Sequence, residues 1–458
     1  MAIPSLDPRT FKPRARPEAP DSISGMKFWY DARRIRGLAN DDSMVVWTDA
    51  SINRATATLG TAPVFRTGDI NSGPAVQGNG TSQHMLTGVA PSVAAGTMVA
   101  AFIATASSDF LMGSQDPGER CYLATSSDGY AGGGVGGHHY NSIEGTSSVT
   151  DGTPHVLIVT YDGSDVSLYL DGALQDAQSQ ADAPGTRDMV LLAADNAGSI
   201  VQHFAGDVGQ LLYYGTAASD DQARELSLYF TDIYGITTGL VRDHGSKKNW
   251  GVMTNMAPAS DYSTTVPSSM IGNSVDFDGT DDHILIGNIY TSGITSGEMS
   301  ISAWINADSL ASGYSSIIKK GTGGSVAWSL DVNDSYVRSH IGTDAGGESN
   351  SNSVSLSTGT WYHLMVVADG TNITIYVDGV AGGGEGYDGT IIGSSHDVAI
   401  GVSWEGSPVY FNGKIDEVKI WERGLSSAEI TALAAEDTSS GDYPAGHSSY
   451  WSFDHGTQ

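Results

Sequence analysis

The chain of 458 residues contains a single cysteine, Cys121, so no disulfide can form within it. Its stability must therefore come from buried apolar cores and not from covalent cross-links. Basic residues are also scarce, because 22 Lys and Arg stand against 52 Asp and Glu, which gives a net charge of −30. Such a charge repels nucleic acid phosphates and argues against a nucleic-acid-binding function.

Long apolar runs and strong helix signals are lacking as well. No run could cross a bilayer, and the N-terminal residues have no apolar core of the kind that a secretory signal requires. We therefore expect a soluble protein that does not use Sec export. What the chain does contain is 58 glycines and short runs rich in Val, Ile, Thr and aromatic residues between Gly/Asp/Ser/Asn turns. This pattern is typical of an all-β sandwich or barrel.

The N-terminal segment, residues 1–25, is rich in proline and in basic residues. Prolines at positions 4, 8, 13, 17 and 20 remove backbone donors and disfavour helix. The first 36 residues hold eight Lys or Arg against four Asp or Glu. Two interpretations stay open. One is a frayed, solvated terminus. The other is an extended arm that docks onto an acidic surface, such as a neighbouring subunit, through Arg9, Lys12, Arg14 and Arg16.

Two halves of the chain repeat one another. The stretch FAGDVGQLLYY, from Phe204, returns 207 positions later as FNGKIDEVKIW, from Phe411. A hairpin pattern with an Asp-Gly turn begins at His155 and again at His363. Further upstream, VQGNGTSQHML (76–86) matches VDFDGTDDHIL (275–285). The chain is therefore a tandem duplication.

The order of motifs in the second repeat resembles the laminin G-like, concanavalin A-like jelly rolls. These motifs are FDGTDD (277–282), MSISAWI (299–305), WYHL (361–364), YVDG (376–379), FNGKIDEVKIW (411–421) and LSSAEI (425–430). The first repeat resembles a bacterial and phage variant of that family, through FWYDA (28–32), VWTDAS (46–51) and SDDQARELSLYFTDIYGI (219–236).

The resemblance implies an all-β fold of two tandem jelly-roll sandwiches, at residues 26–236 and 239–437. A short helix is expected to close each sandwich, with Ser219 and Ser426 as the N-terminal caps. In the first of these helices, Leu226, Tyr229, Phe230 and Ile233 share one face, which predicts packing on the sandwich.

The second repeat departs from the family at its start. Relatives usually open with a strand that reads like YWSFD, but here the matching segment, SYWSFD (449–454), ends the chain. The first and last strands are neighbours in jelly rolls of this family. Residues 438–458 are therefore expected to supply a strand to the vacant position, in their own domain or in another subunit. A disordered tail is the alternative.

No catalytic arrangement is evident in the sequence. The Glu-x-Asp-x-x-Glu strand of related sandwich glycosidases is absent, and the adjacent Asp416 and Glu417 would point to opposite faces of a strand. Cys121 fits a buried strand better than a nucleophile, and the glycine run 132–137 lacks the following Lys-Ser/Thr of a phosphate loop. We therefore expect a protein that is not an enzyme.

Two kinds of ligand site are considered. Carboxylates clustered in a loop suit Ca²⁺, which several laminin G-like relatives bind at a rim loop, and a solvated acidic turn is the alternative. The residues concerned are Asp276, Asp278, Asp281 and Asp282. A saccharide needs an exposed aromatic ring and nearby polar groups, although most aromatic residues in a sandwich belong to the core. The candidates near turn-rich segments are Trp250, Trp328, Tyr336, Tyr387 and Trp404.

These observations lead us to predict a virion structural protein of a tailed phage, on the capsid or the tail, that displays lectin-like domains for particle stabilisation or glycan adhesion. Its expected partners are other virion proteins, contacted through the arm, cell-surface glycans, and further copies of itself. A bacterial extracellular carbohydrate-binding or adhesion protein is the first alternative. A polysaccharide depolymerase whose site is not recognised is the second.

Overall fold

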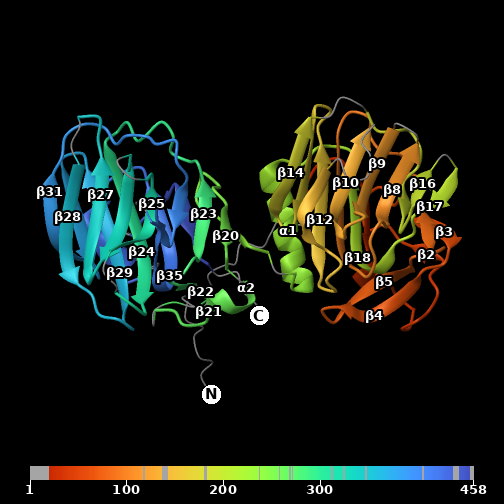
Figure 1. Ribbon diagram of the computed structural model, residues 1–458, viewed down its shortest axis with the longest axis horizontal. Coiled ribbons are helices and arrows are strands. Elements are labelled where there is room, and N and C mark those ends of the chain that lie inside the picture. Colours follow the sequence, from red (N-terminus) through yellow and green to blue (C-terminus); the bar gives the residue numbers. More distant parts are fainter. Residues whose placement is uncertain are drawn as a thin grey trace, which may run out of the picture. The chain divides into compact units, whose positions relative to one another are not determined.

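A computed structural model describes the chain from residue 20 to residue 453, except for residues 117–118, 137–142, 180–182, 197, 237, 257, 268–269, 271, 311–312, 323–324, 346–347, 405–406 and 437–442. The proposed docking residues Arg9, Lys12, Arg14 and Arg16 lie outside the described residues. The described chain divides after Thr238 into two compact units. We call the part up to Thr238 unit 1 and the part from Gly239 onward unit 2. Each is a sandwich of two β-sheets (Figure 1), so the predicted fold class is confirmed.

Unit 1 is built almost entirely of strands. In chain order they are β1 (Met26–Asp31), β2 (Val46–Trp47), β3 (Ala57–Thr61), β4 (Val64–Ile70), β5 (Gly73–Asn79), β6 (His84–Leu86), β7 (Gly96–Ala104), β8 (Phe110–Asp116), β9 (Glu119–Thr125), β10 (Tyr130–Gly136), β11 (Ile143–Ser148), β12 (His155–Tyr161), β13 (Asp165–Leu170), β14 (Ala173–Ser179), β15 (Val190–Leu191), β16 (Ala194–Asn196), β17 (Ser199–Val201) and β18 (Ala205–Tyr214). One sheet has the order β14-β13-β12-β7-β18-β5-β4, with β1 also beside β18. The other has the order β11-β10-β9-β8-β15-β6-β3-β2.

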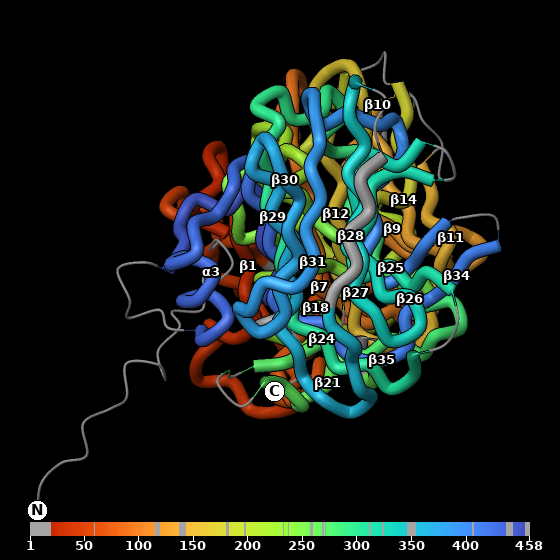
Figure 2. The backbone as a smooth tube through the Cα atoms, turned by 90° about the vertical axis from the view of Figure 1, so that its left-hand side faces the viewer, coloured from red at the N-terminus to blue at the C-terminus, as the bar shows by residue number. Residues whose placement is uncertain are grey.

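Unit 2 repeats this plan. Its strands are β19 (Leu240–Val241), β20 (Gly251–Thr254), β21 (Tyr262–Ser263), β22 (Ser274–Asp278), β23 (His283–Gly287), β24 (Glu298–Ala307), β25 (Tyr314–Lys320), β26 (Trp328–Asn333), β27 (Tyr336–Gly342), β28 (Glu348–Ser355), β29 (Trp361–Asp369), β30 (Asn372–Val377), β31 (Val380–Gly386), β32 (Val398–Ile400), β33 (Val402–Ser403), β34 (Val409–Tyr410), β35 (Asn412–Trp421) and β36 (Ser449–Trp451). The sheets have the orders β19-β20-β23-β32-β25-β26-β27-β28 and β21-β22-β35-β24-β29-β30-β31. The hairpin of β30 and β31 is visible in Figure 2.

Alternation along the strands builds the core of each sandwich. In β12, Leu157 and Val159 face the space between the sheets, whereas Val156 and Ile158 face outward beneath helix α1 (Asp220–Tyr234). Cys121 is fully buried in β9, and burial raises the pKa of its thiol to about 12. The prediction that this cysteine is a buried strand residue is confirmed.

The closing helices are capped as predicted. Ser219 accepts the N–H of Gln222 at the start of α1, and Ser426 accepts the N–H of Glu429 at the start of α3 (Ser427–Ala434). Each of these third residues in turn accepts the N–H of its capping serine. Leu226 and Phe230 of α1 are buried against the sheet, as the helical spacing predicts. A further four-residue helix, α2 (Pro258–Asp261), precedes β21, and none of the described helices is both long and apolar enough to cross a membrane.

The C-terminal strand completes unit 2 within its own chain. β36 runs antiparallel to β35, with Tyr450 opposite Lys419. In unit 1, β1 runs antiparallel to β18, with Trp29 opposite Leu212. Lys419 lies 207 positions after Leu212, which is the offset of the repeat, so β36 occupies in unit 2 the position that β1 occupies in unit 1. The opening strand of unit 2 therefore comes from the end of the chain.

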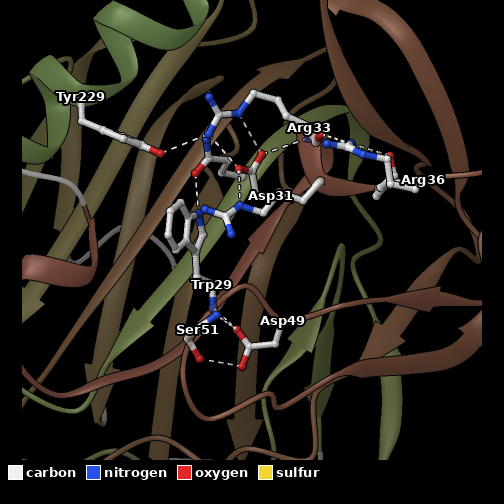
Figure 3. A network of polar contacts seen from close by, with 10 residues as sticks. Trp29, Asp31, Arg33, Arg36, Asp49, Ser51 and Tyr229 are labelled. Atoms are coloured by element: carbon white, nitrogen blue, oxygen red, sulfur yellow. Dashed lines mark hydrogen bonds and ion pairs between the residues drawn. The ribbon is translucent and has the colours of Figure 1, made fainter.

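A buried aspartate holds this strand in both units. In unit 1, Asp49 accepts the backbone N–H groups of Trp29 and Ser51, at 2.8 and 2.7 Å (Figure 3). It also accepts the backbone N–H of Ala55 at 2.6 Å. In unit 2, Asp243 accepts the corresponding N–H groups of Tyr450, Gly245 and Asn249, at 2.7, 2.6 and 2.7 Å. The residue after each aspartate donates its own N–H back to the strand, to the carbonyl of Trp29 or of Tyr450.

Removal of the C-terminal strand should destabilise unit 2. Trp451 is fully buried in the core and Phe453 is 2% exposed, so deletion of residues 446–458 exposes core surface and removes one of the three backbone donors of the Asp243 carboxylate. We expect a loss of at least about 3 kcal/mol in the free energy of unfolding of unit 2, and a similar loss for Trp451→Ala. Urea unfolding followed by fluorescence measures it. Deletion of residues 454–458 alone is the control, and an unchanged unit 2 transition in the longer deletion would refute the assignment.

Candidate functional site

Three of the five aromatic residues that the sequence proposes for ligand contact are buried. Trp250, Trp328 and Tyr387 are 5%, 1% and 8% exposed. The Trp328 ring packs edge-on against Tyr290, with 5.9 Å between the centroids, and the Tyr387 hydroxyl donates to the carbonyl of Gly297. Trp328 and Tyr387 belong to the core between the sheets although turns are near in the sequence, and Trp250 is buried as well. The proposal that they stack on a ligand is therefore wrong.

The other two aromatic residues are accessible, in different parts of unit 2. Trp404 is partly exposed just after β33, where its ring lies 5.2 Å from that of His283 and 6.4 Å from that of Tyr410. Tyr336 is 50% exposed at the start of β27. Both rings are therefore accessible to a ligand.

The acidic loop brings three of its four proposed metal ligands together. Carboxylate oxygens of Asp278, Asp281 and Asp282 lie within 4.8 Å of one another. Asp276 does not join them, because its carboxylate pairs with Lys414 at 3.1 Å on the neighbouring strand β35. The set of four is thus corrected to three.

The local geometry explains the three-residue group and tests whether a cation fits it. Asp278 accepts the N–H of Thr280 in a tight turn, and Asp282 accepts the N–H of Asp278 at 3.0 Å. In unit 1, Asn79 makes the same turn by accepting the N–H groups of Thr81 and Ser82, so the turn itself needs no charge. Three close carboxylates with oxygens left over suit Ca²⁺, whose remaining ligands would be water or a bound molecule.

The second accessible aromatic residue lies on the outward face of strands β25, β26 and β27. Their core-facing residues include Ile318, Leu330 and Val337, so the alternate residues face away from the core. Register places these alternate residues in three rows across the strands. The rows are Tyr314, Asn333 and Tyr336; Ser316, Asp331 and Arg338; and Lys319, Ser329 and His340. We call these nine residues the polar face.

The inner part of the polar face is a fixed hydrogen-bonded layer. Asp331 is 5% exposed and accepts the hydroxyls of Ser316 and Ser329, both at 2.5 Å. Lys319 is 2% exposed and donates to the hydroxyl of Ser403 at 3.3 Å. Tyr314 and Tyr336, at 38% and 50% exposure, are the accessible rings above this layer. The guanidinium carbon of Arg338 lies 4.7 Å from the centroid of the Tyr314 ring.

The positions of unit 1 that correspond to the second and third rows of the polar face are occupied by apolar residues, a tyrosine and glycines. Pairing of β8, β9 and β10 has the same register and the same bulge as that of β25, β26 and β27. The residues that correspond to the row of Ser316, Asp331 and Arg338 are Phe110, Ala124 and Gly132. Those that correspond to the row of Lys319, Ser329 and His340 are Gly113, Tyr122 and Gly134. Phe110, Tyr122 and Ala124 form a small buried apolar cluster with Ala194. The sandwich therefore does not require polar or charged residues at these positions.

The sequence analysis found only Tyr336 of the polar face. A signal was present in YVRSHIG (336–342), where Tyr, Arg and His alternate with Val, Ser and Ile. Alternation alone does not tell which sheet a strand joins or which residues lie opposite it. The bulge in β25 between Ser316 and Ile318 shifts the alternation by one residue and conceals Ser316 and Lys319 as members of one face.

Calcium should bind the acidic loop if the three carboxylates form its ligands. We expect Ca²⁺ to raise the melting temperature of unit 2 and to give measurable heat in calorimetry, and Asp281→Asn to abolish both effects. Asp276→Asn, which alters a carboxylate outside the group, is the matched control. Calorimetry and thermal unfolding with Ca²⁺ or a chelator check this, and the absence of heat and of a stability change would exclude the site.

The same loop should make stability depend on pH. Burial, followed by the carboxylates of Asp278, Asp261 and Asp281, raises the pKa of Asp282 to about 6 in the folded chain. This value lies above that of an unfolded aspartate, so the contribution of Asp282 to stability falls as the pH rises from about 4 to about 6. Without Ca²⁺, Asp282→Asn should gain about 1–3 kcal/mol relative to the wild type at pH 7 but not at pH 4. Urea unfolding at both values tests this, and an equal difference at both would contradict it.

Comparisons with known proteins agree with the observed fold. The family model described as the concanavalin A-like lectin/glucanases superfamily matches residues 81–224 and 278–431, one segment in each unit. A search among curated proteins found no match.

Among solved structures, domains LG4-5 of the mouse laminin alpha1 chain are similar over 80% of this chain and 94% of that chain, with 13% identity and a TM-score of 0.27. Domain 4 of AbnA, a GH43 extracellular arabinanase from Geobacillus stearothermophilus in complex with arabinotriose, matches 43% of this chain and 98% of that chain, with 18% identity and a TM-score of 0.30. Since the family model covers more than half of the chain, the protein belongs to the concanavalin A-like lectin/glucanase superfamily.

Proposed function

We propose that the protein is a carbohydrate-binding protein and that unit 2 binds a saccharide on its polar face. The observation that carries the proposal is the difference between the two units. At register-equivalent positions unit 1 has Phe110, Gly113 and Tyr122, whereas unit 2 has Ser316, Lys319 and Ser329. Buried polar groups cost stability unless they are paired, so the fold alone gives no reason to replace an apolar cluster with them.

The arrangement of the polar face suits a saccharide. Tyr314 and Tyr336 both lie in register with Asn333, two strands apart, so their backbones are separated by about 10 Å. Sugar rings offer apolar C–H surfaces to such rings and hydroxyl groups to polar side chains between them. The hydrogen bonds of Asp331 to two serines keep the layer beneath in one conformation, which lowers the cost of ordering on binding.

A binding role without catalysis fits the surroundings of one carboxylate pair in unit 2. Glu417 and Glu436 lie close together, but they are 2% and 7% exposed. Their oxygens are 2.5 and 3.8 Å from the Nζ atom of the buried Lys419, so they neutralise this lysine inside the protein. That the protein is not an enzyme stays a prediction, and release of reducing sugar from a bound polysaccharide would contradict it.

The biological setting also stays a prediction. A virion component of a tailed phage, with the basic arm docked on other virion proteins, is supported by the composition of the arm and by the motifs of the first repeat. Purified particles that contain the chain in fixed stoichiometry would establish this role. A bacterial extracellular adhesion protein is the alternative, and detection of the chain on a cell surface in the absence of particles would favour it.

Truncation of the exposed tyrosine should weaken saccharide binding. We expect Tyr336→Ala to weaken the binding of any glycan that an array identifies by about five- to thirty-fold, because the exposed ring supplies stacking area. Tyr130→Ala, at the corresponding position of unit 1, is the matched control and should leave the dissociation constant unchanged. Equal affinity of both variants and the wild type would remove the polar face from consideration.

A further inference from the structure

Several basic side chains of unit 2 form ion pairs, whereas Arg338 forms none with the described residues. Lys414 pairs with Asp276 and Asp308, Lys419 with Glu417, and Arg423 with Glu429. Arg338 has no carboxylate partner among the side chains that the structure describes, although the chain carries a net charge of −30. An unpaired cation in so acidic a protein is free to meet an anion that comes from outside.

The surroundings of Arg338 hold its guanidinium in place without neutralising it. Nη1 donates to the hydroxyl of Tyr314, and the guanidinium stacks over that ring at 4.7 Å. Nε is buried and has no hydrogen-bond partner among the described residues. Asp331, the residue opposite in the ladder, directs its two oxygens to Ser316 and Ser329 instead. Arg338 thus offers a positioned donor group that no described carboxylate contacts directly.

His340 adds a second nitrogen donor on the same side of β27. It follows Arg338 by two residues, so both side chains leave the same face, about 7 Å apart along the strand. His340 is partly exposed, and no carboxylate pairs with it in the described part of the chain. Unit 1 has glycine at both corresponding positions, Gly132 and Gly134, so the fold does not require a basic residue at either position.

We infer that the saccharide bound on the polar face is anionic, carrying a carboxylate or a sulfate group, and that Arg338 binds this group with His340 beside it. The inference rests on the proposed function and specifies its ligand class. A planar guanidinium donates two parallel hydrogen bonds to an anionic group, which a neutral hydroxyl cannot accept in the same way. The exposed ring of Tyr336, two residues before Arg338 on the same strand, then contacts the sugar beside the acid.

The test is a glycan array with the full-length chain, followed by calorimetry on matched pairs. The methyl ester of oligogalacturonate lacks the carboxylate charge and carries a methyl group in its place, and dextran lacks the sulfate of dextran sulfate, so the pairs tell the two anions apart. We expect anionic members to bind and Arg338→Gln to weaken their binding at least about tenfold, with Arg338→Lys intermediate. Binding should also weaken as salt is raised.

Arg54→Gln is the matched control, since Arg54 is an exposed arginine of unit 1 and its loss changes the net charge equally. It should leave affinity unchanged, and the melting temperature should show that the Arg338 variants are folded. If only neutral glycans bind, with Tyr336→Ala defective and Arg338→Gln unaffected, the anionic ligand is wrong and the saccharide site stands. If no glycan on the array binds, or binding ignores both substitutions, the proposed function itself fails.

Discussion

A buried carboxylate that accepts three backbone N–H groups holds each sandwich together at its opening strand. Asp49 and Asp243 each join the first strand of their unit to a loop of the other sheet, between β2 and β3 in unit 1 and between β19 and β20 in unit 2. Side chains vary around this carboxylate, but the three donors come from backbone atoms and are available whatever the residue. The strand can therefore enter from the beginning of the domain or from the end of the chain, provided that it reaches the aspartate in register.

Much of the fold could be predicted because it depends on local patterns that occur twice. Short stretches of the sequence are enough to identify the capping serines Ser219 and Ser426, the alternating strands and the displaced segment around Tyr450. The role of Asp243 was not predicted, because its partner Tyr450 lies 207 residues away and is joined to it through the backbone. The residue types Asp and Tyr do not indicate that the carboxylate of one accepts the backbone N–H group of the other over that separation.

The site was predicted less well, for a related physical reason. Trp328, Tyr336 and Tyr387 have similar surroundings in the sequence, and only the side of the sheet to which each points separates core from surface. The acidic loop was easier, since Asp278, Asp281 and Asp282 are near neighbours in the chain. Asp276 was misplaced because alternation along β22 turns it away from the loop and toward Lys414.

The same sandwich carries different side chains on the outward face of β8, β9 and β10 in unit 1 and of β25, β26 and β27 in unit 2. The two sets of side chains cannot be exchanged one residue at a time. In unit 1 the Tyr122 ring covers Gly134, where an added Cβ atom would meet ring atoms at 2.8 Å, and a Cβ atom added to Gly113 would meet the Cβ atom of Tyr122 at 2.7 Å. A side chain such as His340 or Lys319 cannot be placed there unless Tyr122 leaves. Conversion between an apolar cover and a polar face thus requires coordinated replacement of several residues, so single substitutions cannot turn the face of one unit into that of the other.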